Sequence, residues 1–176
     1  MKKIVIMIWI VAAAATAAMA QGDAISKFFN KYQGDESFSQ VTVSSKMFGL
    51  FTNMEMEDPE DQEVLNAISK LKGLKILAKE EARNARELYQ EAMSLIPAKE
   101  YEELMSVRDK DKDMKFFIKE AGGKISELVM VAGGNEEFMV LSLFGEIDLK
   151  QVSKIGRKMS VDGLENLEKI KDVKKN

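Results

Sequence analysis

The chain has 176 residues, with 26 Lys and Arg, 29 Asp and Glu, and a formal net charge of −3. It contains neither cysteine nor histidine, which excludes disulfides, Cys/His zinc sites, thiol nucleophiles and Ser-His-Asp triads. A mildly acidic chain is also a poor general binder of phosphate backbones, so we expect no nucleic-acid partner.

Residues 1–20 have the three parts of a cleavable secretory signal peptide. Two lysines follow the first methionine, an apolar run extends from Ile4 to Val11, and small residues end at Ala18-Met19-Ala20. A membrane anchor is the competing interpretation, but it needs about 20 strongly apolar residues, and this stretch is shorter and rich in alanine. The absence of cysteine excludes a lipid-anchored N-terminus.

The protein is therefore expected to be exported to the periplasm or cell envelope, and not as a lipoprotein. After cleavage of residues 1–20, we expect residues 21–176 to form a single α+β domain with no membrane span. A chain of this length can bury enough surface to fold without covalent cross-links.

The first half of this domain shows mainly helical periodicity. Apolar residues at helical spacing predict four helices, with their apolar positions at Ile25, Phe28, Phe29 and Tyr32; Met47, Phe51 and Met54; Val64, Leu65, Ile68 and Leu71; and Ala85, Leu88, Tyr89, Ala92 and Ile96. Asp58 and Pro59 form a typical start for the third of these helices. Segments 38–43 and 74–78 are expected to be short strands.

The second half changes to the alternating period of strands. Four strands are predicted, at residues 101–107, 114–121, 125–131 and 138–145. Short loops between them force antiparallel neighbours. Asp148 with Gln151, and Asp162 with Glu165, are capping pairs for two more helices. The predicted fold is a four-stranded antiparallel β-meander, which the two short strands can extend, packed with five to six helices.

A two-residue turn at Gly122-Gly123 gives this meander an expected register, in which Phe116 faces Val129. One face then forms the core, and the other is also apolar. The plain explanation is that helices cover both faces. The sharper one is an exposed patch that binds a protein partner, a second copy of the chain or a ligand. This candidate binding site consists of Phe117, Leu128, Met130, Met139 and Leu141, rimmed by Lys115 and Lys119.

No motif predicts a catalytic residue, a metal or a cofactor. Asp109, Asp111 and Asp113 alternate like the opening ligands of an EF-hand loop. The position that needs glycine is Met114, and strand pairing would carry Glu120 away from the loop. Paired carboxylates are abundant, but their abundance does not show that any two converge in a cleft.

Several short motifs occur in an order that is similar to an exported bacterial family, the domain of unknown function (DUF) 4252. The matching segments are Phe28-Phe29-x-x-Tyr32, 41–48, 71–77, 101–105, 123–128 and 145–149. The resemblance implies a signal peptide, a Gram-negative envelope setting and a small α+β domain. It implies no catalytic residues.

The sequence thus favours an envelope protein that acts as a non-catalytic binding or interaction module. Two alternatives stay open. One is a hydrolase-type enzyme that uses carboxylate or lysine chemistry, and the other is a regulatory partner of an envelope-signalling system.

Overall fold

The computed structural model describes residues 25–159, with the side chains of the last helix described as far as Lys154. The expected signal peptide and the expected helix around residues 162–170 lie outside the described residues. In chain order the elements are α2 (Ser26–Tyr32), β1 (Ser39–Ser44), α3 (Ser45–Gly49), the 3₁₀ helix η2 (Leu50–Asn53), α4 (Pro59–Ser69), β2 (Leu71–Lys79), α5 (Ala85–Ser94), β3 (Glu102–Arg108), β4 (Lys112–Ala121), β5 (Lys124–Gly134), β6 (Phe138–Ile147) and α6 (Leu149–Met159).

All six strands belong to one antiparallel sheet in the order β1-β2-β6-β5-β4-β3. Strands β3 to β6 are sequential neighbours, which confirms the predicted meander. The two short strands extend the same sheet, because β2 pairs with β6 and β1 lies outside β2. The α+β class is therefore confirmed, with a six-stranded sheet.

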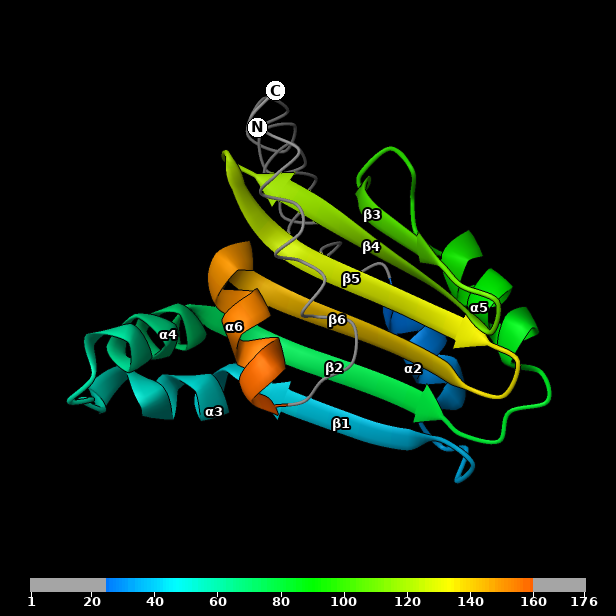
Figure 1. The fold of residues 1–176 in the computed structure, drawn as a ribbon, viewed down its shortest axis with the longest axis horizontal. Coiled ribbons are helices and arrows are strands. Elements are labelled where there is room, and N and C mark those ends of the chain that lie inside the picture. The colour runs from blue at the N-terminus through cyan, green and yellow to red at the C-terminus, as the bar shows by residue number, and fades with distance from the viewer. Residues whose placement is uncertain (1–24, 160–176) are drawn as a thin grey trace, which may run out of the picture.

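Helices lie on both faces of this sheet. In Figure 1, α2 and α5 lie behind the strands, while α6 crosses in front of β6 and β2. Helices α3 and α4 lie beside the end of the sheet where β2 begins. Lys154 ties α6 to α4, since its Nζ is 2.7 Å from Glu60 Oε1.

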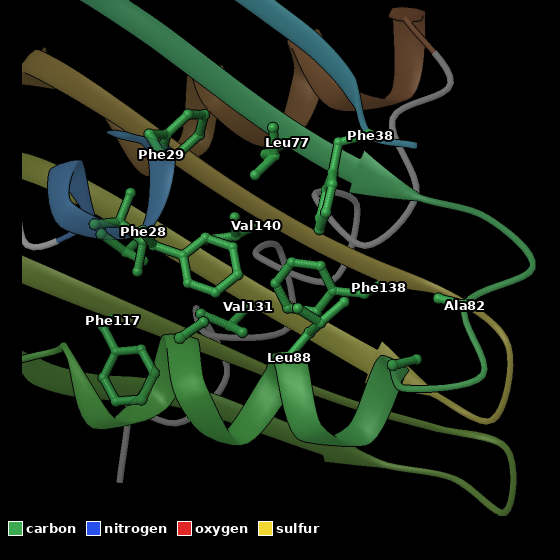
Figure 2. Packing of buried hydrophobic residues seen from close by; sticks show 14 of the residues in the cluster. Phe28, Phe29, Phe38, Leu77, Ala82, Leu88, Phe117, Val131, Phe138 and Val140 are labelled. Carbon is green, nitrogen blue, oxygen red and sulfur yellow. The ribbon is translucent and has the colours of Figure 1, made fainter. Parts of the chain in front are cut away.

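The apolar cluster between the sheet and helices α2 and α5 is called the back core. Figure 2 shows its centre, where the ring centroids of Phe28 and Phe138 are 5.3 Å apart. Its members are Ile25, Phe28, Phe29, Phe38, Leu77, Ala82, Ala85, Leu88, Ala92, Tyr101, Phe117, Val129, Val131, Phe138 and Val140.

A second cluster, called the front core, lies on the opposite face of the sheet. Its buried members are Phe48, Leu71, Met114, Phe116, Ile118, Leu128, Met130, Ala132, Leu141, Leu143, Ile147 and Val152. Both faces of the central strands are thus buried, which explains why these strands are apolar on both sides rather than on one.

The expected register between β4 and β5 holds only at the turn. Ala121 pairs with Lys124 as predicted, but Ser126 is an extra residue on β5 that forms a bulge. Beyond the bulge Phe117, not Phe116, faces Val129. Ser126 Oγ donates to the Lys119 carbonyl at 3.0 Å and so stabilises the bulge. One extra residue exchanges the two faces of a strand relative to its neighbour.

The helix predicted over Met47, Phe51 and Met54 is also different in detail. α3 is five residues long and passes directly into η2, so the angular spacing of one continuous α-helix is lost. Phe48 is the buried side chain, whereas Met47 and Met54 are exposed. The predicted start of α4 is confirmed, because Asp58 Oδ1 accepts the Glu60 N–H at 2.7 Å.

Candidate functional site

The seven residues predicted to form one binding patch lie on two faces of the sheet. Leu128, Met130 and Leu141 belong to the front core and are at most 2 % exposed, with Met139 packed against them. Phe117 belongs to the back core. The prediction of one shared face is therefore wrong for Phe117, because the Ser126 bulge shifts β4 by one residue against β5.

The two lysines of the predicted rim lie on β4 at alternate positions from Phe117, so they share its face. Lys115 Nζ is 2.6 Å from Glu103 Oε2, and this hydrogen bond raises the lysine pKa. Lys119 Nζ is 2.6 Å from Glu100 Oε2 and 5.6 Å from the ring centroid of Tyr101. Both lysines bind acidic side chains near β3 instead of surrounding an apolar patch.

A cleft of about 800 Å³ lies where α4, the first turn of α6 and the β4–β5 hairpin meet. The hairpin turns at Gly122 and Gly123, whose φ angles of 61° and 77° suit a tight two-residue turn. The apolar residues that line the cleft come from four strands and two helices, and they are Ala67, Leu104, Ile118, Ile125, Ile147 and Leu149.

Charged residues of both signs surround this apolar lining. Four carboxylates and three lysines contribute to it, namely Glu63, Glu120, Glu146, Asp148, Lys70, Lys124 and Lys150. Glu146 bridges two of the lysines, at 2.7 Å from Lys124 and 3.4 Å from Lys70. The hydrogen bonds from Lys124 and Lys70 lower the pKa of Glu146, so this carboxyl is ionised at neutral pH.

Gln151 is the polar residue of the cleft with an unused acceptor. Its Nε2 donates to Glu63 Oε2 at 3.4 Å, while its Oε1 is buried without a hydrogen-bond partner among the described residues. The predicted capping pair is half confirmed, because Asp148 Oδ1 accepts the Lys150 N–H at 2.9 Å. The amide of Gln151 contacts Glu63 of α4 instead of completing the pair.

A second buried polar group lies within the sheet, at Glu127. Its carboxylate accepts hydrogen bonds from the hydroxyls of Tyr101 and Ser142, both of which are also buried. The three residues join β5, β6 and the segment before β3, and none of them lines the cleft. Sequence analysis missed this group, although a glutamate inside the apolar run 125–131 is a recognisable signal for it.

The residues described here do not assemble an evident metal centre. No group of three or more Asp or Glu side chains in residues 25–159 is arranged to hold a metal ion. Asp113, from the segment compared with an EF-hand loop, instead contacts Arg108 at 3.1 Å and Arg86 at 3.5 Å. None of the helices in these residues combines the length and the apolar content of a membrane-spanning segment.

Comparison with known proteins gives one match. A family model described as "Domain of unknown function (DUF4252)" matches residues 32–155. No curated protein and no solved structure matches the chain. The match spans β1 to β6 and all the residues that line the cleft.

Proposed function

Because the chain belongs to the DUF4252 family, whose description assigns no activity, we propose a function from its own residues. The protein is an exported, non-catalytic binding module, and the cleft between α4, α6 and the β4–β5 hairpin is its binding site. The ligand class is a short peptide segment with one or more apolar side chains.

The observation that carries this proposal is the buried acceptor of Gln151. A buried polar atom without a partner costs about 1–3 kcal/mol. Gln151 is 7 % exposed, and its Oε1 lacks a partner among the described residues. Gln151 lines the cleft, so a rotation of its amide that turns Oε1 to the cleft lets a ligand's hydrogen-bond donor recover that cost. A peptide N–H is such a donor, and the apolar lining accommodates the neighbouring side chain.

The charges of the cleft support a peptide over an anionic ligand. With four carboxylates and three lysines, the lining has no field of one sign. Both Lys70 and Lys124 are paired with Glu146. A phosphate or sugar acid would have to displace that pairing, whereas a neutral peptide backbone would not.

The same groups give little support to hydrolase-type chemistry. A general acid needs a carboxyl whose pKa is raised toward the working pH. The pKa of Glu146 is shifted the opposite way, by its hydrogen bonds to Lys124 and Lys70. A binding role is therefore the simpler use of this cleft.

Export is the second part of the proposal, and the pattern of residues 1–20 supports it. Expression of the full chain in a Gram-negative host should yield a periplasmic protein that begins at Gln21. Mass spectrometry of the osmotic-shock fraction measures this directly. A product that keeps residues 1–20 and stays with the membranes would contradict export by cleavage.

The binding role is tested with peptides selected from a random hexapeptide display library on immobilised residues 21–176. The selected peptides are synthesised and titrated calorimetrically into the wild-type protein and three variants. Ala67→Trp fills the cleft and should abolish binding. Gln151→Leu removes the acceptor and should weaken binding by about 5-fold or more.

Glu87→Trp, on the exposed side of α5, is the matched control and should bind like the wild type. Thermal unfolding of each variant separates loss of binding from loss of fold. The proposal fails if no peptide is enriched, or if Ala67→Trp binds the selected peptides as tightly as Glu87→Trp does.

A further inference from the structure

Among the side chains that the structure describes, in residues 25–154, the exposed large apolar ones all lie between residues 41 and 56. They belong to β1, α3, η2 and the segment after η2, and with their exposed fractions they are Val41 48 %, Met47 49 %, Leu50 64 %, Met54 45 % and Met56 40 %. An apolar surface concentrated in this way is typical of an interaction site. This surface is called the β1 corner.

The strand at this corner is an edge of the sheet with few features that prevent pairing. β1 has the sequence Ser-Gln-Val-Thr-Val-Ser, without a charge or a proline, and only Val43 is not exposed. An edge strand presents one row of backbone N–H and C=O groups to a possible partner strand. Proteins that stay monomeric usually protect such edges with charges, prolines or bulges.

The opposite edge, β3, has that protection. It begins with Glu102 and Glu103 and ends with Arg108, and its pairing with β4 is irregular between Glu103 and Met105. The ion pair between Glu103 and Lys115 adds further charge to this edge. Of the two edges, β1 is therefore the one fitted to accept a strand.

We propose that the partner is a second copy of this chain, which pairs antiparallel through β1 so that the two six-stranded sheets become continuous. The proposal is independent of the cleft. In an isologous dimer the β1 strand of one copy lies against the β1 strand of the other. Because β1 is uncharged, the two strands meet without like-charge repulsion. Dimerisation through the front face of the sheet, the other possibility, would require residues such as Leu128 and Met130 that are fully buried.

Charges beyond the two ends of β1 favour the same arrangement. Exposed Glu36 precedes the strand and exposed Lys46 follows it. Antiparallel pairing centred on Val41 brings the turn that carries Glu36 in one copy to the same end of the strand pair as the first turn of α3, which carries Lys46, in the other. A strand pair alone falls short of the roughly 1,000 Å² of a specific interface. Met47 and Leu50, which follow β1 directly, supply additional apolar area, and a weak dimer is expected.

The absence of cysteine from the chain gives a clean cross-linking test. Val41→Cys, at the centre of the proposed pair, should form a disulfide-linked dimer on mild oxidation, because facing strand residues have the separation that a disulfide requires. Ser39→Cys, at one end of β1, should cross-link less. Ser106→Cys on β3 is the matched edge control. Equal cross-linking at Ser106 and Val41 would overturn the proposal.

A second pair of variants tests the contact without a cross-link. Val41→Lys and Val41→Glu should each be monomeric in sedimentation, because two like charges meet at the two-fold axis. Mixed in equal amounts, they should recover a heterodimer. The wild type should dimerise with rising concentration. A wild type that stays monomeric at all concentrations, or a mixture that stays monomeric while the wild type dimerises, contradicts pairing through β1.

Discussion

The back core and the β1 corner both contain large apolar side chains, but those of the back core are buried and those of the β1 corner are exposed. Phe28, Phe29 and Phe38 are at most 9 % exposed, whereas Met47 and Leu50 are 49 % and 64 % exposed. In both regions the sequence has apolar residues at helical spacing, from which a helix was predicted. The difference shows that apolar content does not by itself assign a segment to the core. Whether a helix is long enough and held against the sheet decides it.

The covering helices account for this difference. α5 has ten residues and lies against β5 and β6, where the Tyr89 side chain packs closely on Gly133. α2 is joined to α5 by Glu91, which accepts hydrogen bonds from Lys31 at 2.6 Å and Tyr32 at 2.8 Å. At the β1 corner, α3 has five residues and η2 has four, which is too short to bury both sides of the segment.

The largest expected effect is on the back core. Phe28→Ala removes a side chain that is fully buried against Phe138 and Tyr32. The free energy of unfolding should fall by about 3–5 kcal/mol, because the ring's transfer energy is lost and a cavity remains. Chemical denaturation of residues 21–176 measures it. A loss below about 1 kcal/mol would mean that the back core and the β1 corner differ much less in their contribution to stability than their exposed fractions indicate.

A smaller effect is expected at the polar group within the back core. Tyr101→Phe removes the hydroxyl that donates to Glu127 and leaves a buried carboxylate oxygen without that donor. The expected loss in unfolding free energy is about 1–3 kcal/mol. Tyr89→Phe is the matched control, since the Tyr89 hydroxyl makes no hydrogen bond with a described residue. Equal effects of the two changes would contradict a specific role for the Glu127 contact.

The contact between α2 and α5 should depend on pH. Burial alone raises the pKa of Glu91, but the hydrogen bonds from Lys31 and Tyr32 outweigh burial and leave this pKa below its ordinary value. The resulting stabilisation is present above the pKa of the unfolded chain and is lost as pH falls through the folded-state pKa. At neutral pH, Glu91→Gln should cost at most about 1 kcal/mol.

The difference in unfolding free energy between Glu91→Gln and the wild type should become smaller as the pH is lowered. Chemical denaturation at a series of pH values measures it. Tyr32→Phe should raise the pKa of Glu91, as measured by NMR titration of its carboxyl carbon. A Glu91 pKa that is unchanged in Tyr32→Phe would contradict the proposed cause.

The smallest effect is expected at the β1 corner. Leu50→Gln changes a side chain that is 64 % exposed, so the unfolding free energy of the monomer should change by no more than about 0.5 kcal/mol. The measurement is made at a low protein concentration, where dimerisation does not contribute. A loss comparable with that of Phe28→Ala would place Leu50 in the core and remove the contrast between the two regions.

The strands were predictable because their alternating residues reflect the pleat of a sheet. The two short segments also joined the sheet as expected. The register was not fully predictable, because Ser126 is polar and carries no pattern that distinguishes a bulge from an ordinary strand position. This one residue decides on which face Phe117 lies. The burial of Leu128, Met130 and Leu141 in the front core is a separate result, which follows from packing on that face.

The cleft depends on contacts that are distant in sequence. Glu63 and Gln151 meet across 88 residues, and Glu60 meets Lys154. The local pattern at Asp148 and Gln151 predicted the start of α6 correctly, but not that the amide would face α4. Residue spacing predicts contacts within one helical turn, but it does not predict which other helix packs next to that turn.

The position of β2 has a consequence for how the chain reaches its native state. β2 completes its hydrogen bonding only with β6, at residues 138–147. Strands β1 and β2 therefore cannot join the sheet until β6 has been synthesised. Until then β2 and β5 both present open ladders that can capture other nascent chains. Truncation before residue 138 should therefore yield aggregates, and a holding chaperone should be most useful just before the last strand emerges.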